Sequence, residues 1–220
     1  MKTERNFTLL YEDRDLLAVW KKGGLLTIGT EKDKEHNLYH YVREYANLHR
    51  ERIFIVHRLD KDTSGIVLFA KNYPLKEVLQ DEFAKHTVKR YYEAVVKEKL
   101  PLGIKKKVVQ YLSYDPRSGL VRVTKNPKEG KEAITLVTTD HTLPFGTALR
   151  IEILTGRQHQ IRLALHSLGY TLIGDDKYAH DRNKRMYLNE YELDLPSYLH
   201  LKQHRFALTP LWISNKKSEE

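Results

Sequence analysis

A nine-residue polar segment, HRLDKDTSG, occupies positions 57–65 between two short apolar runs. The upstream run is IFIV at 53–56, and the downstream run is IVLFA at 66–70. Apolar runs of this length that are rich in β-branched and aromatic residues predict buried strands. We therefore expect the polar segment to form a loop at one edge of a sheet, where rigid strands usually hold reactive groups.

Asp60 is the residue of this loop whose type best fits catalysis. Arg58 and Lys61 stand near it in the sequence, and a neighbouring cation stabilises an ionised carboxylate. An aspartate held ionised in a pocket could serve as a nucleophile or as a base. An ordinary tight turn would contain the same residue types, because Asp, Thr, Ser and Gly all favour turns. The choice between the two interpretations depends on the rest of the chain.

The whole string resembles the signature loop of the RluA-type RNA pseudouridine synthases, and the resemblance makes Asp60 the catalytic aspartate. Three other segments resemble motifs of that family in the same order. They are LLAVWKKGGLLT at 16–27, LTGRQHQIRLALHSLGYTLIGDDKYA at 154–179 and YLHLKQHRFALTP at 198–210. The pattern covers most of residues 9–212, so we expect the catalytic domain of this family without the extra N-terminal RNA-binding domain that some members carry.

The resemblance implies two partners for Asp60 in the reaction. Arg162 is expected to pair with it and hold it ionised. The strand motif K-x-Y-x-A-x-V matches best when Arg90 takes its first place, which makes Tyr92 the tyrosine that stacks on the base or handles the proton at C5. Tyr91 is the alternative, since a second register also fits. Successive residues of a strand face opposite ways, so only one of the two rings can be in the pocket.

Further residues of the same motifs are expected to bind the substrate. In the signature loop these are His57, Arg58, Leu59 and Thr63. Arg58 resembles the arginine that contacts RNA near the flipped base, and an ion pair within the loop is the alternative for it.

The later motif supplies the other expected substrate contacts, which are Leu154, Arg157, His159 and Gln160. Leu154 resembles the apolar wall under the uracil, and ordinary core packing is its alternative. The other three fall in the first turn of a helix expected to open at Thr155-Gly156, where backbone N–H groups favour phosphate. A solvated helix start would explain them equally.

Composition agrees with an RNA partner, which we expect to be structured tRNA, 23S rRNA or both. The chain has 220 residues, 14 tyrosines and a net charge of +9, and phosphates attract cations while bases stack on rings. It has no cysteine, no signal-peptide pattern and no apolar stretch long enough to span a bilayer. We expect a soluble, cytoplasmic monomer with no membrane association and no obligate protein partner.

Uridine isomerisation is redox-neutral, so no cofactor is expected. No metal is expected either. His36 and His40 have helical metal-binding spacing, but no HExxH, cysteine or acidic cluster supports them.

The pattern predicts an α/β (α+β) fold, with a mixed, mostly antiparallel central sheet flanked by helices and loops. Apolar periodicity indicates strands near 16–20, 89–96, 133–138 and 148–154, and helices near 35–49, from Pro74, and from Thr155 to Gly169. No linker divides the chain, so we expect one pseudouridine synthase domain at 1–214 and a polar tail at 215–220.

Two other functions fit parts of the pattern. One is an RNA chaperone of the same fold, which would keep the basic surface and tolerate loss of Asp60. The other is a nucleoside hydrolase that uses Asp60 and Asp62 as a carboxylate pair and releases free uracil. The identity of the RNA and of its uridine is not encoded in any motif.

Overall fold

The computed structural model of the chain describes residues 2–3, 6–31 and 33–213. Its contacts divide into two compact units. The first comprises Met1–Val88 with Leu193–Ala207, and the second comprises Lys89–Glu192 with Leu208–Glu220. The expected domain at 1–214 spans the first unit and all but the last six residues of the second, and its boundaries stay a prediction. The tail expected at 215–220 lies outside the described residues.

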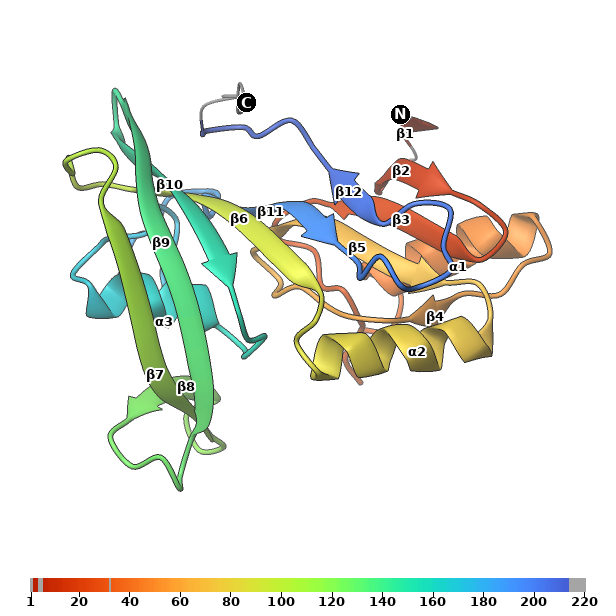
Figure 1. Ribbon diagram of the computed structural model, residues 1–220, viewed down its shortest axis with the longest axis horizontal. Helices are drawn as coiled ribbons and strands as arrows, with labels where there is room; N and C mark the ends of the chain where they lie inside the picture. The colour runs from red at the N-terminus through yellow and green to blue at the C-terminus, as the bar shows by residue number, and fades with distance from the viewer. Residues whose placement is uncertain (1, 4–5, 32, 214–220) are drawn as a thin grey trace. The chain divides into compact units, whose positions relative to one another are not determined.

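The first unit is an antiparallel sheet with two helices (Figure 1). Its elements are β1 (Lys2–Thr3), β2 (Thr8–Glu12), β3 (Leu16–Lys21), α1 (Leu38–Leu48), β4 (Phe54–Ile55), β5 (Ser64–Ala70), α2 (Tyr73–Ala84) and β12 (Arg205–Ala207). The strands pair antiparallel in the order β1, β2, β3, β5, and β4 also pairs with β5. Helix α2 packs on β4 and β5. Both β3 and β5 are almost wholly buried, which accounts for their uninterrupted apolar sequences.

The second unit is a longer sheet with one helix on it. Its elements are β6 (Lys89–Val96), β7 (Lys105–Asp115), β8 (Leu120–Thr124), β9 (Lys131–Leu143), β10 (Gly146–Ile153), α3 (Gln160–Ser167) and β11 (Leu188–Asp194), whose last two residues belong to the first unit. The strand order is β11, β6, β10, β9, β7, β8. Helix α3 packs on one face of β7 and β9 (Figure 1).

The expected fold class is confirmed. The pairs β6–β10, β10–β9, β9–β7 and β7–β8 are antiparallel, and a parallel bridge joins Leu26 to Asn37, so the strand pairing is mixed and mostly antiparallel. Within the described part of the chain, none of the helices has the length and apolar character that crossing a bilayer requires.

Two expectations about local structure need correction. The polar sequence of residues 97–132, interrupted by Pro and Gly, predicts only short antiparallel strands. Instead, β7 runs for 11 residues there, because its alternate residues pack under α3. The last helix begins at Gln160 rather than at Thr155. His159 precedes it in the left-handed region with φ of 56°, and a residue in that conformation cannot continue a right-handed helix backwards.

Helix α2 begins where an asparagine caps it. The side-chain oxygen of Asn72 accepts a hydrogen bond from the Leu75 amide at 2.9 Å, and its amide nitrogen donates to Asp15 at 2.9 Å. Pro74 lies in the first turn, where its missing N–H has no partner to lose. This cap fixes the helix that packs on β5, the strand that follows the signature loop.

The replacement Asn72→Ala should lower the free energy of unfolding by about 1 kcal/mol, because it removes the cap of α2. Asn72→Ser should retain most of the stability, since serine also accepts from the first-turn amides. Urea denaturation followed by circular dichroism would measure both. Equal losses in the two variants would mean that the bond to Asp15, and not the cap, stabilises this corner.

Candidate active site

Residues 57–63 of the signature loop lie between β4 and β5, and its last two residues begin β5. The apolar runs on both sides predicted this arrangement. The amide of Thr63 donates to the carbonyl of Asp60 at 3.2 Å, which closes a turn at 60–63. Asp60 is half-buried, whereas Lys61 and Asp62 are exposed. Asp60 is therefore less exposed to solvent than Asp62, the second carboxylate of the loop.

Lys21 anchors this turn from the end of β3. Its side chain is fully buried, and its Nζ donates to the carbonyls of Leu25 at 2.7 Å, Lys61 at 2.9 Å and Lys22 at 3.1 Å. Three carbonyls match the three donors of an ammonium group. Burial nevertheless lowers the pKa of Lys21 to about 7, and the negative charges of Asp62 and Asp60 oppose that shift.

The backbone on the other side of Asp60 is held by Thr27. Its buried hydroxyl donates to the carbonyl of Leu59 at 2.8 Å and accepts from the amide of the same residue at 3.1 Å. The turn after β3 also touches the loop directly, because a Cβ added at Gly23 would meet the Asp62 carbonyl oxygen at 2.8 Å. Asp60 is thus flanked on both sides by anchored backbone.

The first residue of the loop, His57, is held within the first unit. Its Nε2 accepts from the Leu68 amide at 3.0 Å, and its ring stacks on Phe83 with centroids 4.5 Å apart. A nitrogen that accepts from an amide carries no proton, so Nε2 is unprotonated in this arrangement. Leu59 and Thr63 are buried, whereas Arg58 is exposed. Of the four expected substrate contacts in the loop, Arg58 has its side chain at the surface.

In the second unit, β6 separates the two candidate tyrosines. Tyr92 is 3% exposed, and its hydroxyl accepts from the guanidinium of Arg90. Tyr91 points to the opposite side of the strand and packs against a cluster that includes Tyr191 and Ile213. By strand register, Tyr92 pairs with Ile151 and Arg90 with Ile153. These pairs continue onto β9, across the sheet face that α3 covers.

Arg90 is half-buried on this face and forms an ion pair with the fully buried carboxylate of Glu190. Its Nε donates to Glu190 at 2.8 Å. Burial raises the pKa of Glu190, and the charge of Arg90 and the hydrogen bonds of Arg90 and Tyr92 oppose that shift. Residue 156 comes close above it, because a Cβ added at Gly156 would meet a guanidinium nitrogen of Arg90 at 3.1 Å.

Arg162 is buried on α3 rather than pointing to solvent. It is 5% exposed and makes two hydrogen bonds to Asp175, at 3.0 and 2.5 Å. Its guanidinium also lies over the Tyr178 ring, 5.0 Å from the centroid. Such a fork-to-fork pair fixes the plane of the guanidinium. Arg162 therefore has a fixed orientation on the same face of the sheet as Tyr92.

The segment before α3 is held by Gln160. Its side-chain oxygen accepts from the Thr155 hydroxyl at 2.7 Å and the Arg157 amide at 3.0 Å, and its nitrogen donates to Ile134 and Thr135. His159 is buried and its Nδ1 lies 2.7 Å from the Tyr178 hydroxyl. Leu154 is 40% exposed, and the half-buried Arg157 donates to the Glu132 carbonyl at 3.0 Å.

The expected residues thus form one cluster in each unit: the loop with Asp60 in the first, and the sheet face with Tyr92 and Arg162 in the second. The pairing of Asp60 with Arg162 stays a prediction. Within the described ranges, no three His, Asp or Glu side chains are arranged to hold a metal ion.

Sequence reasoning missed several residues that hold these clusters: Lys21, Thr27, Asp175, Tyr178 and Glu190. Asp175 and Tyr178 stood in the GDDKY string, which offered a signal. Nothing local marked Thr27 or Glu190, whose partners are 32 and 100 residues away.

The replacement Lys21→Met should change how stability depends on pH. The folded-state pKa of Lys21 is lowered to about 7 from 10.5, so between these values the unfolded chain binds more protons than the folded one. Stability then rises with pH across that interval. We would measure the free energy of unfolding of the wild type and of Lys21→Met by urea titration at pH 6.5, 8 and 9.5. The value for the wild type minus the value for the variant should increase with pH. A constant difference would contradict the lowered pKa.

The replacement Asp175→Ala should lower the free energy of unfolding by roughly 3–5 kcal/mol, because it leaves the charge of Arg162 buried without its bidentate partner. Asp176→Ala is the matched control. Asp176 is the next residue and pairs at 3.3 Å with Arg182 at the surface, so its loss should cost less than about 1 kcal/mol. Similar losses in both variants would show that the buried pair of Arg162 and Asp175 contributes no more to stability than the surface pair of Arg182 and Asp176.

The chain was compared with known proteins. The family model described as RNA pseudouridylate synthase matches residues 15–167. Ribosomal large subunit pseudouridine synthase C of Rickettsia bellii is 35% identical over 189 residues, which cover 82% of this chain and 61% of that protein. tRNA pseudouridine synthase C of Haemophilus ducreyi is 29% identical over 196 residues, which cover 81% of this chain and 76% of that protein.

A solved structure, human RNA pseudouridylate synthase domain containing 1, has the same fold with a TM-score of 0.76 at 22% identity. The match covers 96% of this chain and 86% of that one. The chain spans less than two thirds of the length of the Rickettsia bellii relative. The family model nevertheless matches more than half of the chain and includes the signature loop and all of α3. The resemblance seen in the motifs is confirmed, and the chain belongs to the RNA pseudouridylate synthase family.

Proposed function

We propose that this chain isomerises specific uridines of RNA to pseudouridine, with Asp60 as the catalytic carboxylate. The observation that carries the proposal is the anchoring of the HRLD loop in a chain of this family. Lys21 holds the carbonyl of Lys61, and Thr27 holds both backbone groups of Leu59. A carboxylate between two fixed residues keeps its position while the substrate changes, and orientation of this kind lowers reaction barriers.

The proposed reaction breaks the N1–C1′ bond of uridine and forms a C5–C1′ bond after the uracil has turned. The proton on C5 is lost and N1 gains one, so atoms and electrons balance without a cofactor. Asp60 acts either by adding to a carbon of the nucleoside or as a base at the sugar. A uridine within RNA structure is first flipped out of its stack into the pocket.

Tyr92 and Arg162 are the proposed partners from the second unit. Their common face of the sheet supports one pocket for both, and the packing of Tyr91 on the opposite side supports Tyr92 over Tyr91. In this proposal the ring of Tyr92 stacks on the uracil or receives the C5 proton. Arg162, held flat by Asp175, pairs with Asp60.

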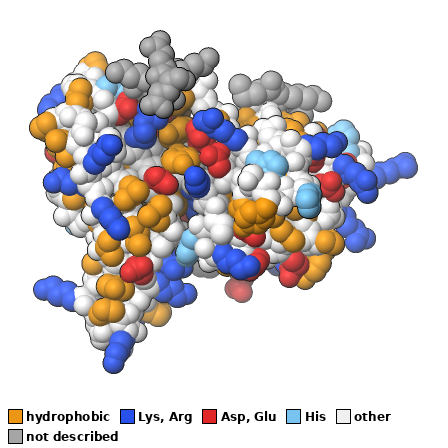
Figure 2. Space-filling view, in the orientation of Figure 1, with side chains coloured by type: hydrophobic (Ala, Val, Ile, Leu, Met, Phe, Trp, Pro, Cys, Tyr) orange, Lys and Arg blue, Asp and Glu red, His pale blue; other side chains and the backbone are white. Residues whose placement is uncertain are grey.

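The proposed substrate is structured RNA, either tRNA or large-subunit ribosomal RNA. Relatives of the chain carry both kinds of name. The net charge of +9 supports a polyanionic partner. On the visible face of the second unit, Figure 2 shows Lys and Arg side chains spread among hydrophobic ones, a mixture that suits phosphates and bases. We propose that the protein works as a monomer in the cytoplasm.

The replacement Asp60→Ala should abolish isomerisation, reducing the rate by roughly 10³-fold or more. Transcribed tRNA and large-subunit rRNA, labelled with tritium at uridine C5, would be incubated with each protein, and tritium release would be followed. Asp62→Ala is the matched control, because it removes an exposed carboxylate two residues away. It should keep activity within severalfold of the wild type.

Other outcomes separate the competing functions. Free uracil among the products, lost in both variants, would favour a hydrolase that uses the two carboxylates as a pair. Tight RNA binding by all three proteins without any tritium release from either RNA would favour a chaperone of the same fold.

A further inference from the structure

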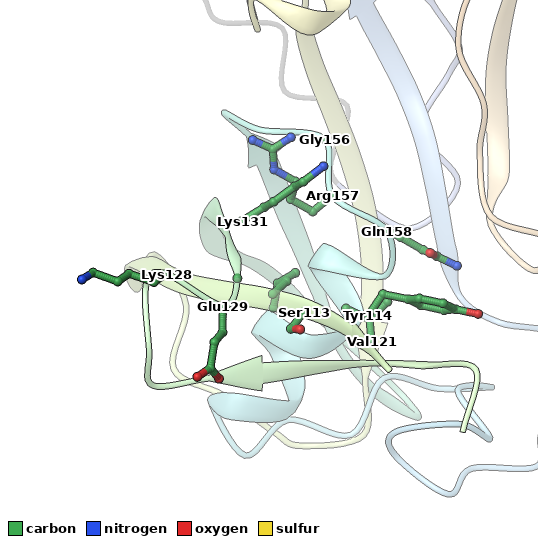
Figure 3. Close-up of a pocket in the computed structure, with 11 residues that line it drawn as sticks. Ser113, Tyr114, Val121, Lys128, Glu129, Lys131, Gly156, Arg157 and Gln158 are labelled. Atoms are coloured by element: carbon green, nitrogen blue, oxygen red, sulfur yellow. The ribbon is translucent and has the colours of Figure 1, made fainter. Parts of the chain in front are cut away.

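The second unit contains a pocket of about 500 Å³ that the proposed reaction does not use (Figure 3). It opens between the β7–β8 hairpin, the loop that leads into β9 and the segment before α3. Its floor is apolar, because Leu112 and Val121 are both buried. All of its lining residues belong to the second unit, so the pocket is defined within one compact body.

Cations dominate the rim of this pocket. Lys128, Lys131 and Arg157 line it, against one carboxylate, that of Glu129. None of the three cations takes part in an ion pair between described residues. The carboxylate of Glu129 instead accepts a hydrogen bond from the side-chain amide of Asn126 at 2.7 Å. The side chains that line the pocket therefore carry more positive than negative charge, which favours an anion.

Two of these cations come from segments that a hydrogen bond joins. The guanidinium of Arg157 donates through Nε to the carbonyl of Glu132 at 3.0 Å, the residue that follows Lys131 on β9. In Figure 3 the side chains of Arg157 and Lys131 are drawn on the same side of the pocket, while Lys128 extends outward from the rim. A fixed guanidinium beside an ammonium provides several donors for the oxygens of one phosphate group.

An aromatic side chain also lines the pocket, and in Figure 3 it extends away from Arg157 and Lys131. Tyr114 is 57% exposed at the end of β7 and pairs in register with Val121 on β8, so its ring and the apolar floor share one side of the hairpin. In RNA-binding proteins, accessible aromatic rings stack on unpaired bases. The cations suit the phosphate of a nucleotide, and the ring and the apolar floor suit its base.

We propose that this pocket binds one nucleotide of the RNA outside the target uridine. Its phosphate contacts Lys131 and Arg157, with Lys128 attracting the strand from the rim, and its base stacks on Tyr114. The inference rests on the proposed function for the identity of the ligand as RNA. It adds a second point of attachment, which selects RNAs that can reach the pocket while their uridine is being modified.

The test measures RNA affinity in variants of the rim and the ring. A pool of end-labelled tRNA would be titrated by fluorescence anisotropy at several salt concentrations. Tyr114→Ala should weaken binding about tenfold, whereas Tyr114→Phe should stay within about twofold, since it keeps the stacking surface. The double variant Lys128→Ala, Lys131→Ala should weaken binding about tenfold and reduce the slope of log K against log salt by about 1.4, as expected for two phosphate contacts on a single strand.

The matched control is the double variant Lys105→Ala, Lys107→Ala. It removes the same charge from exposed positions of β7 that do not line the pocket. Affinity in this control should fall less than twofold. An equal loss in the two double variants, or an unchanged affinity in Tyr114→Ala, would overturn the proposal and leave only general electrostatic attraction. Urea midpoints within error of the wild type would exclude misfolding as the cause.

Two further readouts separate this inference from the proposed function. Ultraviolet crosslinking followed by peptide mapping should attach a nucleotide to the peptide that contains Tyr114, also in Asp60→Ala, so the result stands even if no tritium is released. If isomerisation is observed, the rim variants should raise KM for RNA and leave kcat within about twofold. Displacement of the RNA by micromolar uridine monophosphate would mean that the site serves free nucleotides, and would overturn the assignment to RNA.

Discussion

The candidate site of the first unit depends on the hydrogen bonds that the Lys21 ammonium group donates. This group joins the end of β3, the turn that follows and the signature loop through three backbone carbonyls. Burying a cation is costly unless its donors are satisfied, and here all three are. The hydrogen bond to the Lys61 carbonyl fixes the residue next to Asp60. The position of the signature loop is thereby tied to that of β3, a buried strand. Loss of this anchor would leave the turn at 60–63 with its own Thr63 bond and the attachments of Thr27 on the other side.

In the second unit, ion pairs orient the side chains of the candidate site. Arg162 is buried and Arg90 is half-buried on one face of the sheet, and each is oriented by its own carboxylate, Asp175 and Glu190 respectively. Buried pairs of this kind contribute little net stability compared with apolar packing, but they hold flat guanidinium groups at fixed angles. Tyr92 lies among them, with its hydroxyl bonded to Arg90.

The segment that joins β10 to α3 connects this buried face to the basic pocket. Gln160 uses its whole amide to hold the segment, and the left-handed turn at His159 ends the irregular stretch where the helix begins. One side of this segment carries Gly156 over Arg90, and the same segment presents Arg157 to the pocket. One short segment with few internal degrees of freedom thus contacts both the buried sheet face and the basic pocket.

The sequence by itself determined the family, the fold class and most of the elements. Buried strands leave uninterrupted apolar runs, as in β5, and half-buried ones alternate, as in β10, because these patterns are local. Motif order also singled out the HRLD loop and the α3 segment. Tertiary structure decided what no local pattern encodes: the three carbonyls around Lys21, the carboxylates that orient Arg162 and Arg90, and the pocket built from three separated segments. These contacts join residues up to 100 positions apart, and their partners are ordinary polar residues whose roles arise only when the fold removes them from water.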